Sequence, residues 1–375
     1  MSLVLYRKYR PQTFKEVIGQ EHIVQTLTNA ISKSMISHAY LFIGPRGSGK
    51  TTLARLLAKA ANCQNIQGYE PCNKCSSCVQ INEGRDLDLI EIDAASHRGI
   101  DEIRELRDGI KFAPTSSKYK VFILDEAHQL SKDAANALLK TLEEPPTHAI
   151  FILATTEAHK MIPTIISRCQ RFDFRRLTLT EIMKRLEVLA DKEKIKIEKS
   201  ALELIAVNSR GSFRDAESLL DQVITFASSN IKDEIKLEYI KDLLGMIEIT
   251  EISAFADLII EKKSSVALET IGKIEDKGVD VHEFTKAFID YLRQVLIQKI
   301  TGNPGEKTNP LITGLTADEF KILQLQSGKF NENALRKIIE VFLIAENKMR
   351  YAPILQLPFE LAVLEAIEIV GAKDR

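Results

Sequence analysis

The sequence predicts a doubly wound α/β domain followed by two helical domains. Up to about residue 176, five apolar runs alternate with helical segments, and after them only helical patterns follow. The apolar runs are continuous rather than alternating, which is typical of parallel strands covered on both faces. A chain of 375 residues is also longer than one hydrophobic core ordinarily accommodates. We therefore expect an α/β domain at 1–176 and helical domains at 177–242 and 243–375.

Each predicted element rests on its own pattern. The expected strands are "AYLFIG", "DLIEID", "KVFILDE", "AIFILATT" and "RFDF", and the helices between them are "TTLARLLAKAANC", "DEIRELRDGI" and "KDAANALLKTLEEPP". The second domain shows the helical patterns "LTEIMKRLEVLADKEKI", "SALELIAVNSRG" and "RDAESLLDQVITFA". In the third domain, helical spacing puts five apolar residues on one helix face: Phe284, Phe288, Tyr291, Leu292 and Val295. The segment "TGNPGEKTNP" is expected to be a loop.

Composition limits the classes of function. The chain is 45% hydrophobic and 27% charged, and its formal net charge is −1. This charge gives no overall attraction to nucleic acid, so contact with DNA would need a local patch. No run of 18 apolar residues occurs, and the N-terminus lacks the apolar core of a signal peptide. We expect a cytoplasmic protein, in which five cysteines do not form a disulfide framework.

A glycine-rich loop predicts a phosphate site. "GPRGSGKT" fits the pattern G-x-x-x-x-G-K-[ST], lies after an apolar run and precedes an amphipathic helix. Backbone N–H groups and the helix N-terminus would surround the anion. Lys50 would reach the β and γ phosphates and Thr51 would hold Mg²⁺. The predicted phosphate residues are Gly44, Pro45, Arg46, Gly47, Ser48, Gly49, Lys50, Thr51 and Thr52. The simpler alternative is a glycine turn before a helix.

Two acids predict hydrolysis rather than binding alone. "KVFILDEAH" places Asp125 and Glu126 directly after four buried apolar residues. One carboxylate can hold the metal ion while the other orients the attacking water.

Four cysteines predict a metal site. Cys63, Cys72, Cys75 and Cys78 follow the spacing C-x₈-C-x₂-C-x₂-C, which suits tetrahedral zinc. The alternatives are a disulfide pair or four buried free thiols. Four ligands leave no open position, so the zinc would be structural, and we expect its loss to leave the nucleotide contacts in place. Cys169 has no such neighbours and is interpreted as a packed thiol.

Several motifs then occur in a recognisable order. They are "YRPQTFKEVIGQEHI", "GPRGSGKT", the four-cysteine insert, "LDEAHQLS", "LLKTLEEPP", "LATTE", "ISRC" and "GSFRDAESLLDQ". Together they resemble the gamma/tau subunits of the bacterial DNA polymerase III clamp loader, which are AAA+ ATPases. The resemblance implies an α/β AAA+ P-loop domain with a zinc-binding insert at about 62–80, a helical lid domain that carries sensor 2, and an all-helical collar domain for oligomerisation.

The resemblance also implies roles for individual residues. It assigns Asp125 to the metal ion and Glu126 to the attacking water. "LATTE" is similar to sensor 1, where we favour Thr156 over Thr155 for contact with the γ-phosphate or its attacking water. "GSFRDA" is similar to sensor 2, which places Arg214 over the nucleotide. The segment that surrounds adenine would contribute Tyr6, Arg7, Arg10, Pro11 and Ile18. Without the resemblance, Arg214 would be an ordinary surface charge and Tyr6 a core aromatic residue.

Arg168 in "ISRC" resembles a finger that acts on the ATP of the neighbouring subunit. No acid lies beside it in the sequence, so we expect it to have no partner in its own chain. Taken alone, such an arginine would be interpreted as half of a surface salt bridge.

The function implied is that of an ATP-hydrolysing subunit within the DNA polymerase III holoenzyme. It would use ATP and Mg²⁺ to open the sliding clamp and load it onto primer–template DNA, together with other clamp-loader subunits. The segment "ASHRGIDEIRELRD" lacks a basic cluster, so DNA contact there is less clearly marked. The chain also lacks the long extension of the tau form, which indicates a short form or a truncated chain. The alternatives are a AAA+ helicase or branch-migration motor, which should lack the cysteine insert, and a non-hydrolysing scaffold, which would not need Lys50, Asp125 and Glu126.

Overall fold

A computed structural model describes most of the chain. The described residues are 4–96, 109–110, 112–230, 234–243, 247–276, 278–302, 309, 311–312, 315 and 317–371. Most of the predicted helix at 101–110, most of the predicted loop at 301–310 and residues 97–108 of the segment considered for DNA contact lie outside these ranges. The chain forms two compact units, which divide between Lys236 and Leu237. The domain boundaries at 176 and 242 therefore stay predictions.

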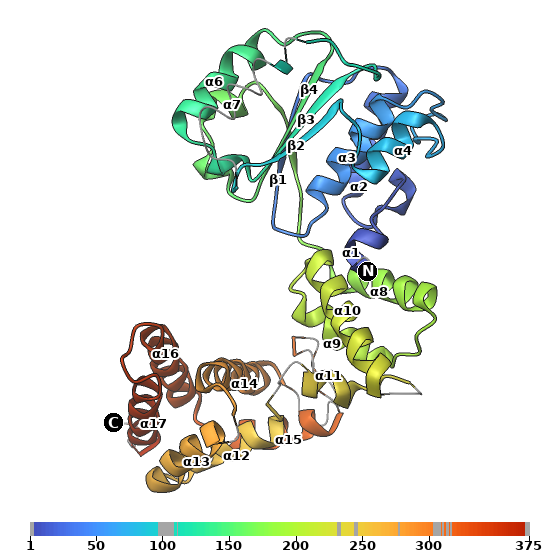
Figure 1. Ribbon diagram of the computed structural model, residues 1–375. Coiled ribbons are helices and arrows are strands. Elements are labelled where there is room, and N and C mark those ends of the chain that lie inside the picture. The colour runs from blue at the N-terminus through green and yellow to red at the C-terminus, as the bar shows by residue number, and fades with distance from the viewer. Residues whose placement is uncertain are drawn as a thin grey trace. The chain divides into compact units, whose positions relative to one another are not determined.

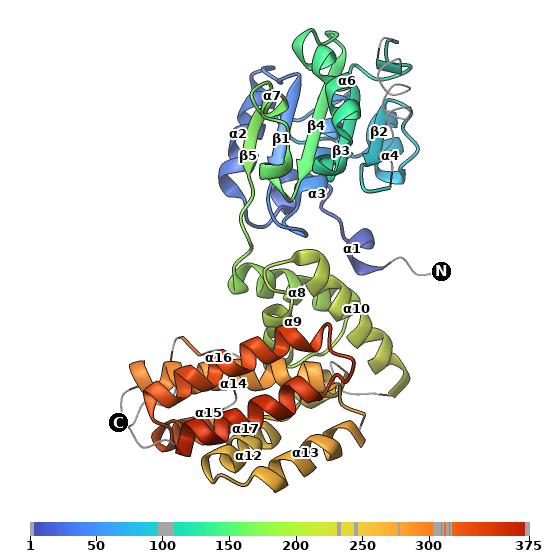
Figure 2. The ribbon, with the colours of Figure 1, turned by 90° about the vertical axis from the view of Figure 1, so that its left-hand side faces the viewer.

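All five predicted strands are present and form one parallel sheet. They are β1 (Ala39–Ile43), β2 (Leu89–Asp93), β3 (Lys120–Asp125), β4 (Ala149–Thr155) and β5 (Gln170–Asp173). The strand order is β2-β3-β4-β1-β5, as Figure 2 shows, and every pair is parallel. β4, although later in the chain, is therefore inserted between β1 and β3, and the carboxyl ends of these three strands are neighbours.

Helices cover both faces of the sheet (Figure 1). On one face, Tyr40 and Phe42 pack with α2 (Glu21–Ser32) and α3 (Lys50–Ala61). On the other face, Leu41 and Ile43 pack with α6 (Lys132–Glu143) and α7 (Pro163–Ile166). Because successive side chains of a strand point to opposite faces, two covered faces require apolar residues at every position. This requirement explains the continuous apolar runs.

The α/β part of the first unit also contains short elements. Among the described residues they are α1 (Leu5–Lys8), η1 (Phe14–Glu16), α4 (Ser76–Glu83), η2 (Ala127–Gln129) and η3 (Ala158–Lys160). After β5, the described part of this unit contains α8 (Leu179–Glu193), α9 (Lys199–Asn208) and α10 (Phe213–Asn230).

The start of α8 is tied to the α/β part through one arginine. The Thr178 hydroxyl caps α8 by accepting from the Glu181 N–H, and the Glu181 carboxylate accepts in return from the Thr178 N–H, which is a capping box. The Arg175 side chain donates to Glu181 over 2.6 Å and holds the pKa of that carboxyl at about 2. The Gln20 side chain bonds both backbone groups of Arg175, at 2.8 and 3.2 Å. The motif "GQ" therefore orients the segment that leads into α8.

The second unit is helical and has an aromatic core. Its helices are α11 (Leu237–Leu243), α12 (Ile249–Ile260), α13 (Ser264–Asp276), α14 (Val281–Thr301), α15 (Ala317–Lys329), α16 (Glu332–Met349) and α17 (Leu357–Gly371). The apolar face that the sequence predicts on α14 is buried there. Phe288 packs edge-on against Phe255 and Phe342, with ring centroids 5.3 and 4.9 Å apart. No helix among the described residues is long and apolar enough to cross a membrane.

Replacing Phe288 by alanine should destabilise the second unit. Phe288 is fully buried, so Phe288→Ala leaves a cavity that costs about 3–5 kcal/mol. Hydrogen exchange read by mass spectrometry should show faster exchange in α12, α14 and α16 and unchanged exchange in the five-stranded sheet. The matched control is Leu325→Ala, an exposed leucine that should cost about 0.5 kcal/mol or less. Equal effects of the two substitutions would contradict the aromatic core.

Candidate functional site

The phosphate loop lies at the carboxyl end of β1. It leads into α3, which begins at Lys50. Gly47 and Gly49 have φ angles of +74° and +99°, which side-chain-bearing residues rarely adopt. A Cβ atom on Gly47 would also lie 1.9 Å from the Ser212 hydroxyl. The backbone conformation at these two positions therefore requires glycine. The first N–H groups of α3 have no partner within the helix and are available to an anion bound at the loop.

A cavity of about 550 Å³ lies over this loop. All predicted nucleotide-binding residues line it except Gly44 and Pro45: Tyr6, Arg7, Arg10, Pro11, Ile18, Arg46, Gly47, Ser48, Gly49, Lys50, Thr51, Thr52 and Arg214. The lining also contains residues that the sequence did not single out, namely Glu16, Val17, Asp93, Ala95, Arg185, Phe213 and Glu217. Asp125 and Glu126 complete it.

The Lys50 side chain folds back over the phosphate loop. Its ammonium group donates to the carbonyl groups of Gly44 and Pro45, at 2.8 and 2.9 Å. Burial lowers the pKa of Lys50, and the carboxylates of Glu126 and Asp125 oppose that shift. A cation held this close to an anion-binding loop offers a direct partner for a phosphate group.

Thr51 of α3 and Asp125 at the end of β3 are joined by a hydrogen bond. The Thr51 hydroxyl donates to a carboxylate oxygen of Asp125 over 2.8 Å, although the two residues are 74 positions apart. Thr51 comes from the first turn of α3 and Asp125 from the end of β3. A hydroxyl and a carboxylate are the oxygen ligands that Mg²⁺ prefers, so this pair fits a shared magnesium ion.

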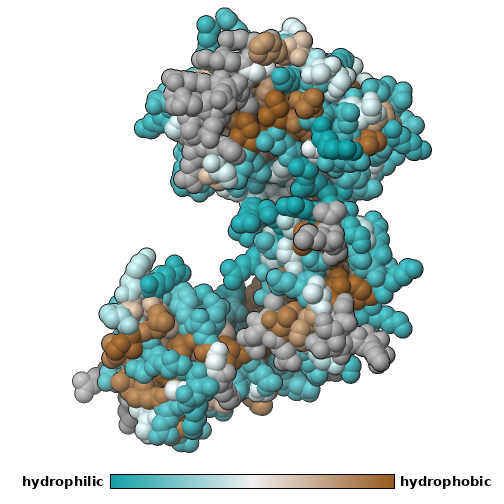
Figure 3. Space-filling model, in the orientation of Figure 1, coloured by the Kyte–Doolittle hydropathy of each residue, from teal (hydrophilic) through white to brown (hydrophobic). Residues whose placement is uncertain are grey.

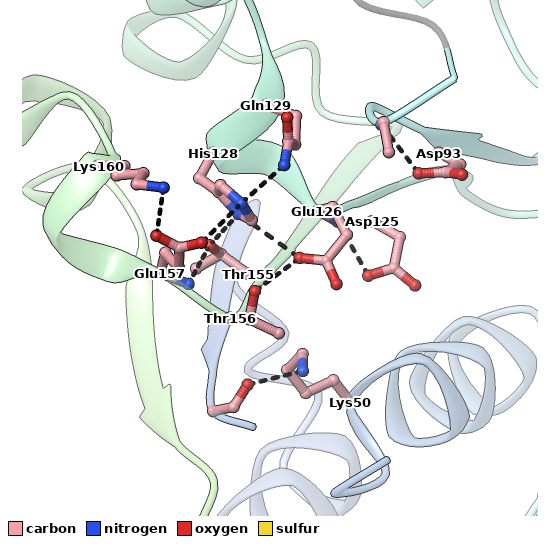
Figure 4. A network of polar contacts seen from close by, with 12 residues as sticks. Lys50, Asp93, Asp125, Glu126, His128, Gln129, Thr155, Thr156, Glu157 and Lys160 are labelled. Carbon is pink, nitrogen blue, oxygen red and sulfur yellow. Dashed lines mark hydrogen bonds and ion pairs between the residues drawn. The ribbon is translucent and has the colours of Figure 1, made fainter. Parts of the chain in front are cut away.

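Glu126 and the end of β4 form a polar network (Figure 4). The Thr156 hydroxyl donates to the Glu126 carboxylate over 2.9 Å. The Thr155 side chain is instead buried, and its hydroxyl lies 2.9 Å from Nδ1 of His128. Thr156 therefore contacts the Glu126 carboxylate directly, whereas Thr155 reaches it only through His128, whose Nδ1 lies 3.5 Å from that carboxylate. Glu126 has a φ angle of +48°, a strained value for a residue with a side chain, and such strain is typical of functional sites.

The start of α10 contacts the phosphate loop. The backbone N–H of Phe213 donates to the Gly47 carbonyl over 3.2 Å. Arg214, the next residue, lies over the Tyr6 ring, 5.0 Å from its centroid. A buried pair, Arg185 with Glu217 at 2.7 Å, joins α8 to α10 beside the cavity. Cationic and aromatic side chains from α1, α8 and α10 therefore line part of the cavity, together with the Glu217 carboxylate.

Arg168 has a partner in its own chain, so that expectation was wrong. Its guanidinium donates to the Glu143 carboxylate over 2.6 Å and to the Thr164 carbonyl over 2.8 Å. Glu143 is the last residue of α6, 25 positions earlier, and this separation hid the pair from the sequence. Both side chains are partly exposed, at 32% and 49%, so the pair contributes little to stability and can exchange. Next to it, burial raises the pKa of the Cys169 thiol to about 12, as expected of a packed cysteine.

The four cysteines of the insert gather in one place. The sulfur atoms of Cys63, Cys72, Cys75 and Cys78 all lie within 4.8 Å of one another. Tetrahedral zinc with bonds of about 2.3 Å needs sulfur–sulfur distances of about 3.8 Å, which is compatible with this spacing. Backbone N–H groups of Lys74 and Cys75 lower the pKa of Cys72 to about 6, which favours a thiolate ligand. Burial raises the pKa of Cys78, and a bound cation would offset that shift because it favours the thiolate. The set therefore fits a metal ion better than free thiols.

Sequence reasoning missed several residues of the site. His128 lies within "LDEAH", directly after the acids, and its position there was the available signal. Asp93 ends β2 in line with Asp125, which only the parallel register reveals. Gln20, Arg185 and Glu217 act through pairs more than 30 residues apart, for which the sequence carries no local signal.

Three family models match in succession: "DNA polymerase III, delta subunit" over residues 19–178, "DNA polymerase III clamp loader subunit, ATPase lid domain" over 181–229, and "DNA polymerase III subunits gamma and tau domain III" over 235–375. The DNA polymerase III subunit gamma of Buchnera aphidicola from Acyrthosiphon pisum is 35% identical over 98% of this chain and 99% of its own length. The chain belongs to the gamma/tau family of DNA polymerase III clamp-loader subunits.

The share of a relative's own length that the chain covers varies from one relative to another. The DNA polymerase III subunit tau of Bacillus subtilis is 45% identical over 96% of this chain, and the chain spans only 62% of its length. Among solved structures, the RuvB Holliday junction branch migration motor of Thermotoga maritima aligns with 89% of this chain and 90% of its own, at 19% identity and a TM-score of 0.47. The gamma/tau match rests on sequence along nearly the whole chain.

Replacing Glu126 by glutamine should separate hydrolysis from binding. Glu126→Gln keeps the side-chain shape and an acceptor for Thr156, so ATP affinity should stay within about twofold. Hydrolysis, measured as phosphate release, should fall at least about 100-fold, because a positioned base contributes that much. The matched control is Glu157→Gln, which changes an acid that approaches His128 but does not line the cavity. Similar losses in both variants would argue against a special role for Glu126.

Proposed function

We propose that this chain is an ATP-hydrolysing motor subunit of the bacterial replicative clamp loader. It would use ATP binding to open a ring-shaped sliding clamp, and hydrolysis to release the clamp on primed DNA. The observation that carries the proposal is that one cavity is lined by the phosphate loop, by the hydrogen-bonded pair Thr51 and Asp125, and by Glu126, whose carboxylate accepts a hydrogen bond from Thr156. Membership of the gamma/tau family supports the same conclusion.

The proposed roles follow from chemistry and position. Lys50 and the loop N–H groups bind the β and γ phosphates, while Thr51 and Asp125 hold magnesium. When bound, Mg²⁺ neutralises charge that develops on the phosphates. Glu126 orients and deprotonates the attacking water, and Thr156 fixes that carboxylate.

Further residues of the cavity lining complete the proposed nucleotide site. Arg214 adds positive charge from α10, since it lines the same cavity as Lys50. The adenine would lie among Tyr6, Arg7, Arg10, Pro11 and Ile18, which line this cavity too.

The insert would hold one structural zinc ion. Cys63, Cys72, Cys75 and Cys78 provide four thiolates, the set that zinc occupies in closed sites. No sulfur is left over to bind a substrate, so the zinc would contribute folding energy rather than chemistry.

Partners follow from the gamma/tau assignment and from the surface. Exposed apolar residues lie on and between α16 and α17, where Figure 3 shows apolar patches on the second unit: Leu343, Ile344, Tyr351, Ile354, Leu355, Leu357, Leu361 and Leu364. A patch of this kind favours contact with other protein subunits. We assign it to oligomerisation with other clamp-loader subunits, whereas the sliding clamp and primer–template DNA would be contacted elsewhere on the assembly.

Arg168 is proposed to act on the ATP of the neighbouring subunit. Its exposed pair with Glu143 is weak enough to exchange for a phosphate on another chain. An arginine supplied across an interface contributes about 10³–10⁵ in rate. Hydrolysis would then depend on assembly, and the isolated chain would bind ATP but turn it over slowly.

Mixing two inactive variants tests this proposal. Arg168→Ala should spare ATP binding, because Lys50 and Thr51 stay in place, but should abolish most hydrolysis in the assembly. Lys50→Ala should weaken binding at its own site. In mixed assemblies, the intact loop of an Arg168→Ala subunit meets the arginine of a Lys50→Ala neighbour, so hydrolysis should partly return. Arg171→Ala, which removes a nearby exposed arginine, serves as the control and should stay active. No rescue at any ratio, with mixed assembly verified, would exclude action across the interface.

A further inference from the structure

The segment that lines the nucleoside side of the cavity has little structure of its own. This N-terminal segment, residues 6–18, contributes Arg10, Pro11, Val17 and Ile18 to the lining. Its regular elements are one turn of α1 and the three-residue η1. Elements this short are not stable alone, because each has too few hydrogen bonds to offset the entropy of ordering the chain. The position of the segment must therefore come from contacts with other parts of the unit.

Glu70 provides the first of these contacts. Its two carboxylate oxygens accept hydrogen bonds from the backbone N–H groups of Phe14 and Lys15, at 2.8 and 3.0 Å. These are the first two residues after the Thr13 N-cap, whose N–H groups have no partner within η1. A carboxylate there makes charge-assisted bonds, which are stronger than neutral ones. Glu70 itself lies in the insert, between Cys63 and Cys72.

A second group of contacts holds Gln12. The Asn73 side-chain amide donates to the Gln12 carbonyl over 3.2 Å, and Asn73 lies between Cys72 and Cys75. The buried ammonium group of Lys59, from α3, donates to the Gln12 side chain over 2.8 Å and to Asn82 of α4 over 2.9 Å. One lysine therefore joins the N-terminal segment, the phosphate-loop helix and the helix that carries Cys78.

An aromatic contact adds to these hydrogen bonds. Phe14, which is 2% exposed, meets the Tyr69 ring edge-on, with centroids 6.5 Å apart. Tyr69 and Glu70 are neighbours, so the insert contacts the start of η1 through one apolar and one charged side chain.

The loop that carries Glu70 and Asn73 depends on the cysteine cluster. Between Cys63 and Ser76 the backbone forms turns and a single bridge, Gln67 with Glu70, rather than a helix or a strand. Four thiolates bound to one ion would join the start of this loop at Cys63 to its far end at Cys72 and Cys75 and to Cys78 in α4. Without such a crosslink, the chain entropy of the loop opposes any fixed position of Glu70 and Asn73.

We propose that the metal-bound insert positions residues 12–15, and through them the side of the cavity that receives the nucleoside part of ATP. This inference rests on the proposed function, because it assumes that the cavity binds ATP. It replaces the sequence-based expectation that loss of the metal leaves the nucleotide contacts in place. Glu70, Asn73 and Lys59 are positioning residues in this account and do not touch the phosphates.

The test compares ATP with inorganic triphosphate, which has the phosphates but no nucleoside. Glu70→Ala in the full chain should keep its zinc, measured by metal analysis, and should bind ATP about tenfold more weakly, as expected for lost hydrogen bonds to a charged group. Its affinity for triphosphate should not change. Glu83→Ala, an exposed acid of α4 that pairs with Arg85, is the control and should match the wild type.

Two further variants of the chain extend the test. Asn73→Gly keeps the left-handed backbone at that position, where φ is 57°, and removes only the side chain. It should also weaken ATP binding, and it provides an independent test in case Glu70→Ala folds poorly. Cys75→Ser should lower zinc content and ATP affinity together and spare triphosphate.

The outcomes distinguish the inference from the function on which it rests. Unchanged ATP affinity in Glu70→Ala, Asn73→Gly and Cys75→Ser would overturn the inference alone. An equal loss of ATP and triphosphate would overturn it too, because the effect would not be confined to the nucleoside. A wild-type chain that binds neither ligand would overturn the proposed nucleotide site itself, and the inference with it.

Discussion

The site depends on the order of three parallel strands. β4 lies between β1 and β3, so the carboxyl ends of all three meet at one edge of the sheet. Ligands of open α/β sheets bind outside such edges. β1 leads into the phosphate loop, β3 ends at Asp125 and is followed by Glu126, and β4 ends at Thr155 and is followed by Thr156. The 2.8 Å bond from Thr51 to Asp125 and the 2.9 Å bond from Thr156 to Glu126 follow directly from that order.

Around this edge, the phosphate loop connects with two other parts of the first unit. At Gly47, a backbone hydrogen bond and close packing against Ser212 join the loop to the start of α10. At the far end of α3, Lys59 joins the same helix to the cysteine insert and to Gln12. The phosphate loop and the helix that follows it are therefore connected both to α10 and to the N-terminal segment.

Much of the fold and the core of the site could be predicted from local sequence patterns. The five strands, the phosphate loop, the acid pair and the cysteine set each lie within a short stretch in which residue type and spacing carry the physics. The pairs that orient these groups could not be predicted. Glu143 with Arg168, Gln20 with Arg175 and Glu70 with Phe14 join residues 25, 155 and 56 positions apart. Polar contacts of this kind leave no periodicity in the sequence, and only the folded backbone brings them together.

Stimulation of ATP hydrolysis in the reconstituted assembly tests the central claim most directly. The rate of phosphate release would be measured with neither addition, with the sliding clamp alone, with primed DNA alone, and with both. The account predicts slow hydrolysis without them and marked stimulation when clamp and primed DNA are present together, because hydrolysis would release the clamp on DNA. A rate that is the same in all four conditions would contradict the clamp-loading function, even if the ATP site itself were active.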